Sequence, residues 1–312
     1  MLRPGDTIGI VAPASPVERD QLEAGCATLR RLGYTPVYDP SIFDAELYFA
    51  GSVERRAREL QEMFARSDVH AIICARGGYG CNYLLPHIDL DLIRRHPKIF
   101  MGYSDVTTLL TYLCDAAGLI TFHGPMAARD FAQPEGVDET SFRQLSQPAV
   151  TSVIAADSGL RSLVEGDARG QLYGGCLSLL VASLGTPYEI NTEETILFLE
   201  DINAKPYQVD RMLTQLKLAG KLDAVRGIIF GEMKDCGAPA GSSYGLEDVV
   251  SRVVGDLHVP VAYGFPSGHV QARNRTIPIG ASAFLEVSNT VTFGWEPAVA
   301  TVDSQTAGSS KS

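Results

Sequence analysis

Short apolar runs alternate with stretches of helical periodicity along the first half of the chain. Residues 20–32 and 54–65 repeat apolar side chains at the spacing of an amphipathic helix, and the first of these stretches stops at Gly33. Strands that are apolar throughout and alternate with helices are typical of a parallel sheet covered on both faces. The strands predicted in this half are Thr7–Ala12, Thr35–Tyr38, Ala71–Cys74, Ile99–Met101 and Leu119–Phe122.

This pattern predicts an α/β fold whose N-terminal domain, residues 1–155, has a parallel sheet of the Rossmann or flavodoxin-like kind. The second half predicts a smaller, mixed α+β, barrel-like domain over residues 165–300, reached through a crossing segment at 147–163 that is rich in small and polar residues. We expect the polar tail, 301–312, to be disordered. The elements predicted in the second half are helices at 176–184, 207–219 and 246–257, and strands at 195–200, 225–231 and 291–293.

The 312 residues carry a net charge of −11, which argues against a nucleic-acid partner, because a phosphate backbone requires a basic face. No apolar run is long enough to span a bilayer, and the first residues lack the pattern of a signal peptide, so we expect no membrane partner. The cysteines are scattered, without a C-x-x-C pair, which fits free thiols in a reducing compartment and therefore the cytoplasm. They are Cys26, Cys74, Cys81, Cys114, Cys176 and Cys236.

The stretch FMGYSDVTTLLTYL turns from a strand to a helix within four residues, 102–105. A serine at so tight a turn has its hydroxyl pushed out above the sheet, and the following helix aims free backbone N–H groups at the same space. Those donors stabilise the oxyanion of an attacked carbonyl, which is the logic of a nucleophile elbow. Because Val106 stands where G-x-S-x-G has its second glycine, a helix cap at Ser104 or Asp105 is the alternative interpretation.

A glycine-rich loop, Arg76-Gly77-Gly78-Tyr79-Gly80, follows the third predicted strand, beside the expected position of the elbow. Glycines let the backbone come close to a ligand and present N–H groups to it. The loop matches neither G-x-G-x-x-G nor a Walker loop. A tight turn without a ligand is therefore the alternative.

A serine nucleophile needs a base, and the base needs an acidic partner. His123 follows the fifth predicted strand, and His269 lies in a loop shaped by glycine and proline, so spacing alone does not choose between them. Glu200 ends the apolar strand TILFLE and is the candidate acid. A salt bridge to Lys205 or Arg211 is the alternative role for Glu200.

Blocks of sequence over nearly the whole chain resemble the LD-carboxypeptidase family, serine peptidases with Ser–Glu–His chemistry that include the microcin C immunity peptidases. The resemblance implies that Ser104 in GYSD is the nucleophile, Glu200 in FLEDI the acid and His269 in SGHV the base, in a cleft between the domains. The blocks are RPGDTIGIVAPAS, ARGGYG, GYSDVT, FHGPM, YGGCLSLL, LFLEDINAKPYQVDRML and GFPSGHVQARNRTIPIG.

The same resemblance implies the residues around the triad. The oxyanion hole would use the backbone N–H of Asp105 and one from Gly77 or Gly78. A terminal carboxylate requires a cation with a planar fork, for which arginine is suited. The residues assigned to substrate binding are Arg76, His123 and Arg273, with Arg129 and Arg275 as further candidates for the clamp.

The resemblance implies a cytoplasmic hydrolase that removes the terminal D-alanine from muropeptide tetrapeptides during cell-wall recycling, as a homodimer and with no cofactor or metal. Two alternatives stay open. A microcin C immunity-type peptidase would cleave an aminoacyl-nucleotide amide and needs an aromatic platform, for which Trp295, near the last strand, is poorly placed. A catalytically silent peptide-binding protein would be expected to lack a member of the triad. The loop 234–246, rich in small residues, is a candidate for substrate choice.

Overall fold

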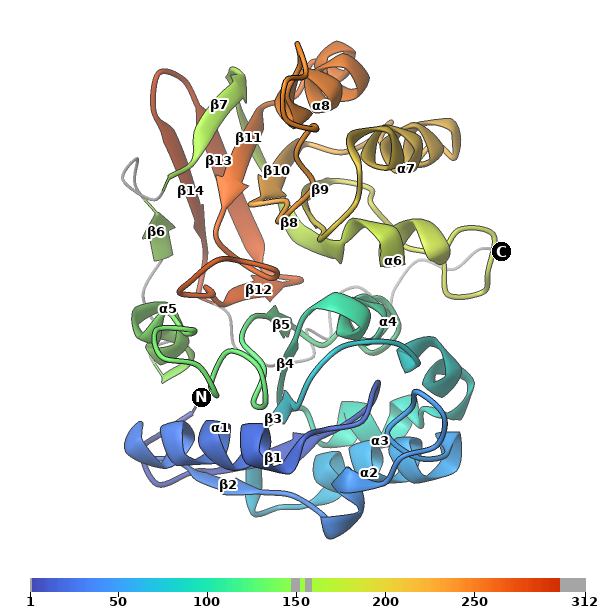
Figure 1. Cartoon of the computed structure of the whole chain (residues 1–312), viewed down its shortest axis with the longest axis vertical. Coiled ribbons are helices and arrows are strands. Elements are labelled where there is room, and N and C mark those ends of the chain that lie inside the picture. The colour runs from blue at the N-terminus through green and yellow to red at the C-terminus, as the bar shows by residue number, and fades with distance from the viewer. Residues whose placement is uncertain (1, 147–151, 155–158, 298–312) are drawn as a thin grey trace, which may run out of the picture.

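The computed structural model describes residues 2–146, 152–154 and 159–297. Two sheets organise these residues, one in each half of the molecule. In Figure 1 the N-terminal elements, blue to teal, fill the lower half, and the C-terminal elements, yellow to red, fill the upper half. The site described below lies where the two halves meet.

The N-terminal sheet has the strand order β12-β5-β4-β3-β1-β2. Its first five strands in sequence pair in parallel, and their order is that of the flavodoxin-like fold, which confirms the predicted class. The strands are β1 (Thr7–Val11), β2 (Thr35–Val37), β3 (Val69–Cys74), β4 (Ile99–Gly102), β5 (Thr121–His123) and β12 (Ile277–Ile279).

Helices cover both faces of this sheet. Helix α1 packs Leu22 and Leu29 on one face, and the next three helices pack on the other, where Leu60 and Leu109 are buried. Helix α2 begins after Ser52, whose hydroxyl accepts a hydrogen bond from the backbone N–H of Arg55 as a cap. The helices are α1 (Arg19–Arg31), α2 (Val53–Ala65), α3 (Leu90–Arg95), α4 (Thr107–Ala117) and α5 (Glu139–Arg143), with 3-10 turns η1 (Pro40–Phe43), η2 (Cys81–His87), η3 (Ser104–Val106) and η4 (Gln144–Ser146).

The C-terminal sheet is mixed and curls into a half-barrel, which confirms the predicted barrel-like domain. Strands β8 to β11 pair in parallel, and the strands on both sides of them are antiparallel. The elements are β6 (Ser152–Ile154), β7 (Arg161–Val164), β8 (Gly166–Cys176), α6 (Leu177–Ala182), β9 (Thr195–Glu200), α7 (Pro206–Leu218), β10 (Gly227–Gly231), α8 (Leu246–Val254), η6 (Gly255–Leu257), β11 (Val261–Phe265), β13 (Ser282–Val287) and β14 (Val291–Trp295).

Strand β12 joins the two halves. Its backbone pairs antiparallel with β5 at the edge of the N-terminal sheet, yet Ile277 and Ile279 are buried in the C-terminal core. The β11–β12 loop, residues 266–276, therefore starts on one sheet and ends on the other. This loop contains His269, and the arrangement places it at the boundary between the halves.

Some sequence expectations fall on residues outside the described part. The crossing segment at 147–163 is described only in part, where it forms the edge strands β6 and β7, and the tail 301–312 lies outside the described residues. The domain limits of 1–155 and 165–300 stay a prediction. None of the helices in the described ranges combines the length and apolar character that crossing a membrane requires.

Helix α1 approaches the segment after β5 so closely that only glycine fits at Gly25. A Cβ atom there would lie 1.8 Å from the carbonyl oxygen of Ala127. We expect Gly25→Ala to lower the free energy of unfolding by about 1–3 kcal/mol, because the helix must move away from that segment. Urea unfolding followed by circular dichroism measures the change. Gly255→Ala is the matched control, since a Cβ at Gly255 meets no atom within 4 Å; equal stability of the two variants would contradict the prediction.

Candidate active site

Ser104 stands at the corner between β4 and α4, in a strained backbone conformation. Its φ angle is 63°, in the left-handed region, which costs a residue other than glycine about 1–3 kcal/mol. The corner is tight because Gly102 lets the chain fold back: a Cβ at Gly102 would lie 2.8 Å from Cγ1 of Val106. The strand-to-helix corner that the sequence predicted is therefore present, with the geometry of a nucleophile elbow.

The glycine-rich loop after β3 packs directly against this serine. A Cβ at Gly77 would lie 2.8 Å from Cβ and 3.0 Å from Oγ of Ser104, so the two loops meet at the hydroxyl. Gly78 has a φ of +123° and packs on Ser15, which leaves no space for a larger residue. The proximity of Gly77 agrees with the predicted oxyanion hole, but the role of the Gly77, Gly78 and Asp105 amides stays a prediction.

The side chain of Asp105 holds the elbow and the glycine-rich loop together. Its Oδ2 accepts a hydrogen bond of 2.8 Å from the backbone N–H of Cys81, at the end of that loop. Burial raises the pKa of Asp105, and the hydrogen bonds from Cys81 act in the opposite direction. The residue after the candidate nucleophile is thus a structural tie between two loops, beyond any role of its backbone N–H.

Glu200 and His269 meet at the boundary between the halves. Glu200 ends β9 and is 1% exposed, and its Oε2 lies 2.7 Å from Nδ1 of His269. The same oxygen accepts a second hydrogen bond, of 3.0 Å, from the backbone N–H of His269. The salt bridges to Lys205 and Arg211 that the sequence left open do not form within the described residues.

The electrostatics of this pair suit a base and its orienting acid. Burial would raise the pKa of Glu200, but the charges and hydrogen bonds of His269 and His123 lower it to about 2, so the carboxylate stays ionised. Burial would lower the pKa of His269, but Glu200 outweighs burial and raises it above 6.5. A histidine whose Nδ1 binds a carboxylate presents Nε2 to a partner. The ring of His269 stands edge-on to Tyr103, the neighbour of Ser104, with centroids 5.1 Å apart.

Ser104 is the member of the predicted triad that the Glu200–His269 pair does not engage in the described residues. Within the described residues, no hydrogen bond joins the hydroxyl of Ser104 to the imidazole of His269. Catalytic hydrogen bonds are often long before substrate binds and tighten in the complex. The structure brings Glu200 and His269 together, while the serine–histidine contact and the catalytic roles of all three residues stay predictions.

The residues assigned to substrate binding lie in different surroundings. His123 is 0% exposed and its ring contacts Ser267 and Glu200, which removes it from direct contact with a ligand. Arg76 donates from Nη1 to the carbonyl of Pro16 at 3.2 Å, and its Nε is buried without a partner in the described chain. Arg273 is exposed and pairs with Glu135 at 3.3 Å.

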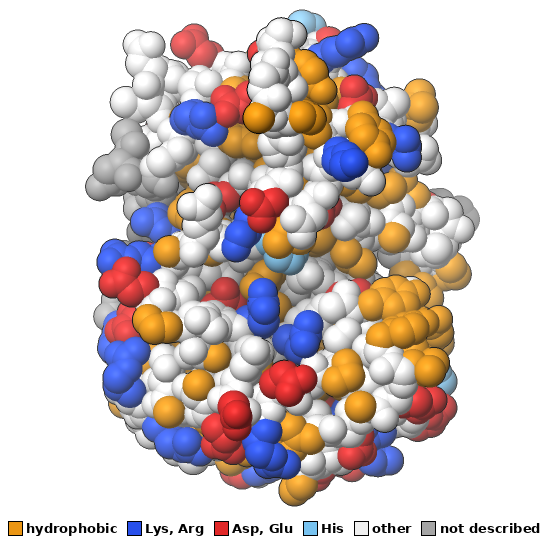
Figure 2. All heavy atoms as spheres, viewed as in Figure 1, with side chains coloured by type: hydrophobic (Ala, Val, Ile, Leu, Met, Phe, Trp, Pro, Cys, Tyr) orange, Lys and Arg blue, Asp and Glu red, His pale blue; other side chains and the backbone are white. Residues whose placement is uncertain are grey.

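A polar cleft of about 330 Å³ opens beside His269 and Tyr103. Its cations are Arg129, which the sequence named only as a further candidate, and Lys234, which it did not name. Lys234 follows the carboxyl end of the parallel strand β10, so the rule that placed the other candidates would also have found it. Figure 2 shows the hollow between the halves, with a histidine and several lysine or arginine side chains around it.

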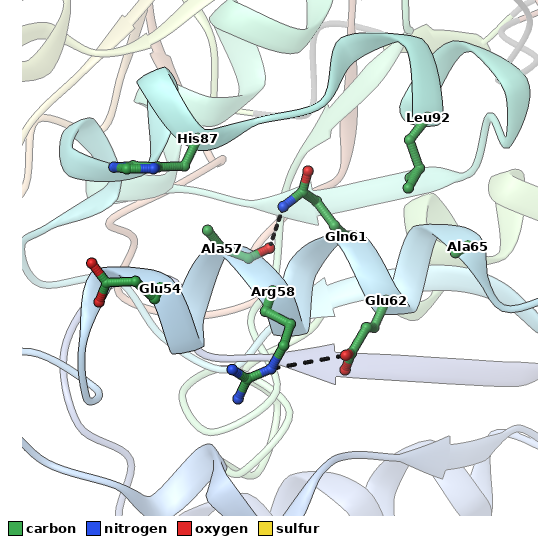
Figure 3. A pocket seen from close by; sticks show the side chains of 8 residues that line it. All are labelled: Glu54, Ala57, Arg58, Gln61, Glu62, Ala65, His87 and Leu92. Atoms are coloured by element: carbon green, nitrogen blue, oxygen red, sulfur yellow. Dashed lines mark hydrogen bonds and ion pairs between the residues drawn. The ribbon is translucent and has the colours of Figure 1, made fainter.

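A cluster of possible metal ligands lies beside this cleft, and a second groove lies elsewhere on the molecule. Ligand atoms of Cys176, Glu200 and His269 lie within 4.8 Å of one another, but Oε2 of Glu200 and Nδ1 of His269 are already used in their mutual contact. A separate groove along α2, shown in Figure 3, is lined by Arg58, Gln61 and His87 among others and contains no residue of the triad.

Two family models match the chain, one in each half. The model of the LD-carboxypeptidase N-terminal domain matches residues 8–124, and that of the C-terminal domain matches residues 169–285. The chain belongs to the LD-carboxypeptidase family. Ser104 lies in the first matched segment and Glu200 and His269 in the second, so the family's division into two parts runs through the site.

Individual LD-carboxypeptidase relatives extend over most of the chain. A probable murein peptide carboxypeptidase of Bacillus subtilis (strain 168) is 40% identical over 290 residues, covering 92% of this chain and 91% of that protein. A murein tetrapeptide carboxypeptidase of Pseudomonas aeruginosa is 31% identical, covering 89% of this chain and 92% of that protein. The structure of MccF in complex with glutamyl sulfamoyl guanosine is 26% identical, with a TM-score of 0.85, covering 96% of this chain and 98% of that one.

The pKa of His269 predicts the pH dependence of activity. A general base must be neutral to accept a proton, so kcat/KM should fall as the pH drops below the pKa of His269. Because Glu200 raises that pKa, we expect the acidic limb to lie above pH 6.5 in the free enzyme. Glu200→Gln removes the charge and should move the limb to lower pH while reducing kcat. An acidic limb that does not move in Glu200→Gln would show that His269 is not the base.

The contact between Gly77 and Ser104 predicts a strong effect on rate. In Gly77→Ala the new methyl group would crowd Oγ of Ser104 and displace the hydroxyl, so we expect kcat to fall about 100-fold. The thermal midpoint should fall as well, because Gly77 is buried and the methyl group would press on the side chain of Ser104, so kcat is measured well below that midpoint. Steady-state kinetics and a thermal scan measure the two effects, with Gly255→Ala as control. Unchanged kcat would place the reacting hydroxyl elsewhere.

Proposed function

We propose that this protein is a serine carboxypeptidase that hydrolyses the L-to-D peptide bond before the terminal D-alanine of muropeptide tetrapeptides. The observation that carries the proposal is the buried Glu200–His269 pair beside a serine held at a φ of 63°. The names of the B. subtilis and P. aeruginosa relatives support a murein peptide as substrate.

In the proposed reaction, Oγ of Ser104 attacks the carbonyl carbon of the scissile bond and its proton passes to Nε2 of His269. The carbonyl oxygen becomes an oxyanion beside the loop of Gly77. As the C–N bond breaks, the same proton moves to the nitrogen of the departing D-alanine, which leaves an ester on Ser104. Water then attacks the ester, gives one proton to His269, and the tripeptide acid departs as Ser104 regains its proton.

The cleft supplies charges for the free end of such a substrate. Arg129, Lys234 and His269 line it together with Asp130 and Glu135, whose carboxylates already accept hydrogen bonds from Asn274 and Arg273. A terminal carboxylate there would lie near two cations and near the proposed base. Lys234 already donates from Nζ to the carbonyl of Val270 at 3.2 Å, which orients its ammonium group beside His269. Recognition of a free C-terminus is what separates a carboxypeptidase from an endopeptidase.

A second candidate keeps the triad and changes the substrate. Solved structures of MccF, a microcin C7 self immunity protein, resemble this chain over 96% of its length, one of them in complex with glutamyl sulfamoyl guanosine. An equivalent reaction here would require an aromatic side chain on which the nucleobase of the substrate could stack. Trp295 does not supply one, because it is 5% exposed and packs on Phe293 in the C-terminal core. The cytoplasmic location and the homodimer stay predictions.

Replacement of the nucleophile tests the proposal. We expect the purified protein to release D-alanine from a muropeptide tetrapeptide, and Ser104→Ala to reduce kcat at least about 1000-fold while the thermal midpoint is kept. Mass spectrometry of the peptide measures the loss of one alanine. Ser288→Ala, in an exposed turn, is the matched control.

An aminoacyl sulfamoyl nucleotide assayed in parallel separates the two candidate substrates. Cleavage of that compound alone would favour the microcin-type function. Full activity of Ser104→Ala on either substrate would contradict the serine mechanism, and no turnover of either would favour the silent binding protein.

A further inference from the structure

One guanidinium group, that of Arg56 in α2, joins three segments at the carboxyl edge of the N-terminal sheet. Its Nε donates to the carbonyl of Gly51 at 3.2 Å, and its Nη1 donates to those of Pro13 at 2.6 Å and Gly80 at 2.9 Å. These carbonyls belong to the segment before α2, the segment after β1 and the glycine-rich loop after β3. Arg56 is 1% exposed, so these contacts are made in the interior.

The charge of Arg56 is buried without a direct ion pair. Within the described residues, no carboxylate forms a salt bridge with it, whereas its neighbour Arg55 pairs with Glu59 at 3.2 Å. Arginine keeps its proton in proteins, so the cost of burying this charge must be offset by hydrogen bonds and by charges further away. Burial lowers the pKa of Arg56, and the buried Asp105 is among the groups that act in the opposite direction.

Arg56 and Asp105 hold opposite ends of one peptide bond. Nη1 of Arg56 donates to the carbonyl of Gly80, and Oδ2 of Asp105 accepts from the N–H of Cys81 at 2.8 Å. Nη2 of Arg56 and Oδ1 of Asp105 are buried and have no hydrogen-bond partner in the described chain, so the two side chains meet through this peptide. A hydrogen bond from a charged donor is about twice as strong as a neutral one, and the Gly80–Cys81 peptide is therefore firmly fixed.

The fixed peptide ends the loop that packs on the candidate nucleophile. At the start of the loop, a Cβ at Gly77 would lie 2.8 Å from Cβ of Ser104. At its end, the N–H of Cys81 binds the side chain of the residue that follows Ser104. A Cβ at Gly80 would lie 2.9 Å from Nη1 of Arg56, so the guanidinium group lies directly against the loop backbone.

The segment after β1 supports the same loop from another side. Oγ of Ser15 in this segment accepts a hydrogen bond of 3.1 Å from the backbone N–H of Tyr79. Arg56 holds this segment as well, through the carbonyl of Pro13. Loss of the guanidinium group would therefore release the loop directly and also loosen the segment on which it rests.

We propose that Arg56 is a positioning residue of the active site, which holds the glycine-rich loop against Ser104 through the Gly80–Cys81 peptide. This inference rests on the proposed function, because an oxyanion forms only if Ser104 attacks a carbonyl. Backbone donors are effective only when they lie about 2.7–3.1 Å from the oxyanion, so a small shift of the loop removes most of their effect. Arg56 acts through the loop and does not touch the substrate.

The hold on the loop can be tested without any substrate. In the full-length protein, Arg56→Met removes the guanidinium group and keeps most of the apolar part of the side chain. We expect the amides of residues 77–81 to exchange with deuterium at least about 10-fold faster than in the unaltered protein, because the loop then opens more readily. Hydrogen exchange followed by mass spectrometry measures the rates. Unchanged exchange in the folded variant would overturn the proposal, whatever the substrate is.

Two other arginines of α2 are matched controls. Arg55→Met removes a buried guanidinium group whose hydrogen bonds, to Glu59 among others, do not reach the loop. Arg58→Met removes an exposed one, which pairs with Glu62 in Figure 3. We expect neither to change the exchange of residues 77–81. Equal acceleration in Arg55→Met and Arg56→Met would show a general loss of packing and would overturn the proposal.

The kinetic test measures kcat and KM for D-alanine release well below the thermal midpoint of each variant. Arg56→Met should lower kcat about 100-fold and leave KM within about 2-fold, because the loop acts on the transition state and not on substrate binding. Arg56→Lys keeps a charge but lacks the planar fork, so it should lose about 10-fold. A loss confined to KM, or an unchanged kcat in Arg56→Lys, would contradict the inference; the lysine variant decides the question if the methionine variant does not fold.

A double substitution tests whether Arg56 and Asp105 act through the same peptide. If they do, Arg56→Met combined with Asp105→Ala should lose no more than about 3-fold beyond the larger single loss, since coupled residues are not additive. A loss equal to the product of the two single losses would show independent action and would count against the shared peptide. Absence of D-alanine release from the unaltered protein would instead count against the proposed function, and the exchange rates would then decide the role of Arg56 by themselves.

Discussion

The site depends on one buried hydrogen bond between elements of different origin, Glu200 at the end of β9 and His269 in the loop between β11 and β12. A carboxylate that is 1% exposed is stable only if it is paired, so the fold must bring cations or donors to it. Both donors from His269 reach the same oxygen, and this fixes the ring relative to the strand. The serine then needs only to be presented at the correct corner of the N-terminal sheet.

Hydrogen bonds of residues outside the predicted triad hold Ser104 and the loop with His269 in place. The loop with His269 is tied to the N-terminal half through Asn274, whose amide donates to Asp130 at 3.2 Å and whose carbonyl oxygen accepts from the backbone N–H of Gly268 at 2.9 Å. Asp105 ties the elbow to the glycine-rich loop in the same manner. Each of these ties limits how far Ser104 and His269 can move apart.

The sequence predicted the parts of this structure that depend on short-range patterns. Strand β9 was predicted to its last residue because an apolar run ends abruptly at Glu200, and the elbow was found because a strand meets a helix within four residues. Strand β8 was missed because its first half alternates between exposed and partly exposed positions, with no apolar run, and includes glycine and charged residues. His123 was assigned to substrate because it follows a strand at the carboxyl edge, and that rule does not tell which side chains face solvent. The same rule does not separate Arg273, which is exposed, from Lys234, which lines the cleft. Only tertiary packing decides which cation lies in the cleft.

The double attachment of β12 has a consequence for how the molecule fails. The strand is hydrogen-bonded to one half and packed into the core of the other, so the β11–β12 loop with His269 connects the two halves. A rotation of one half relative to the other would displace this loop before either hydrophobic core is exposed. Heat inactivation should therefore set in ahead of melting, and a compound that wedges the halves apart would disable the protein without unfolding it.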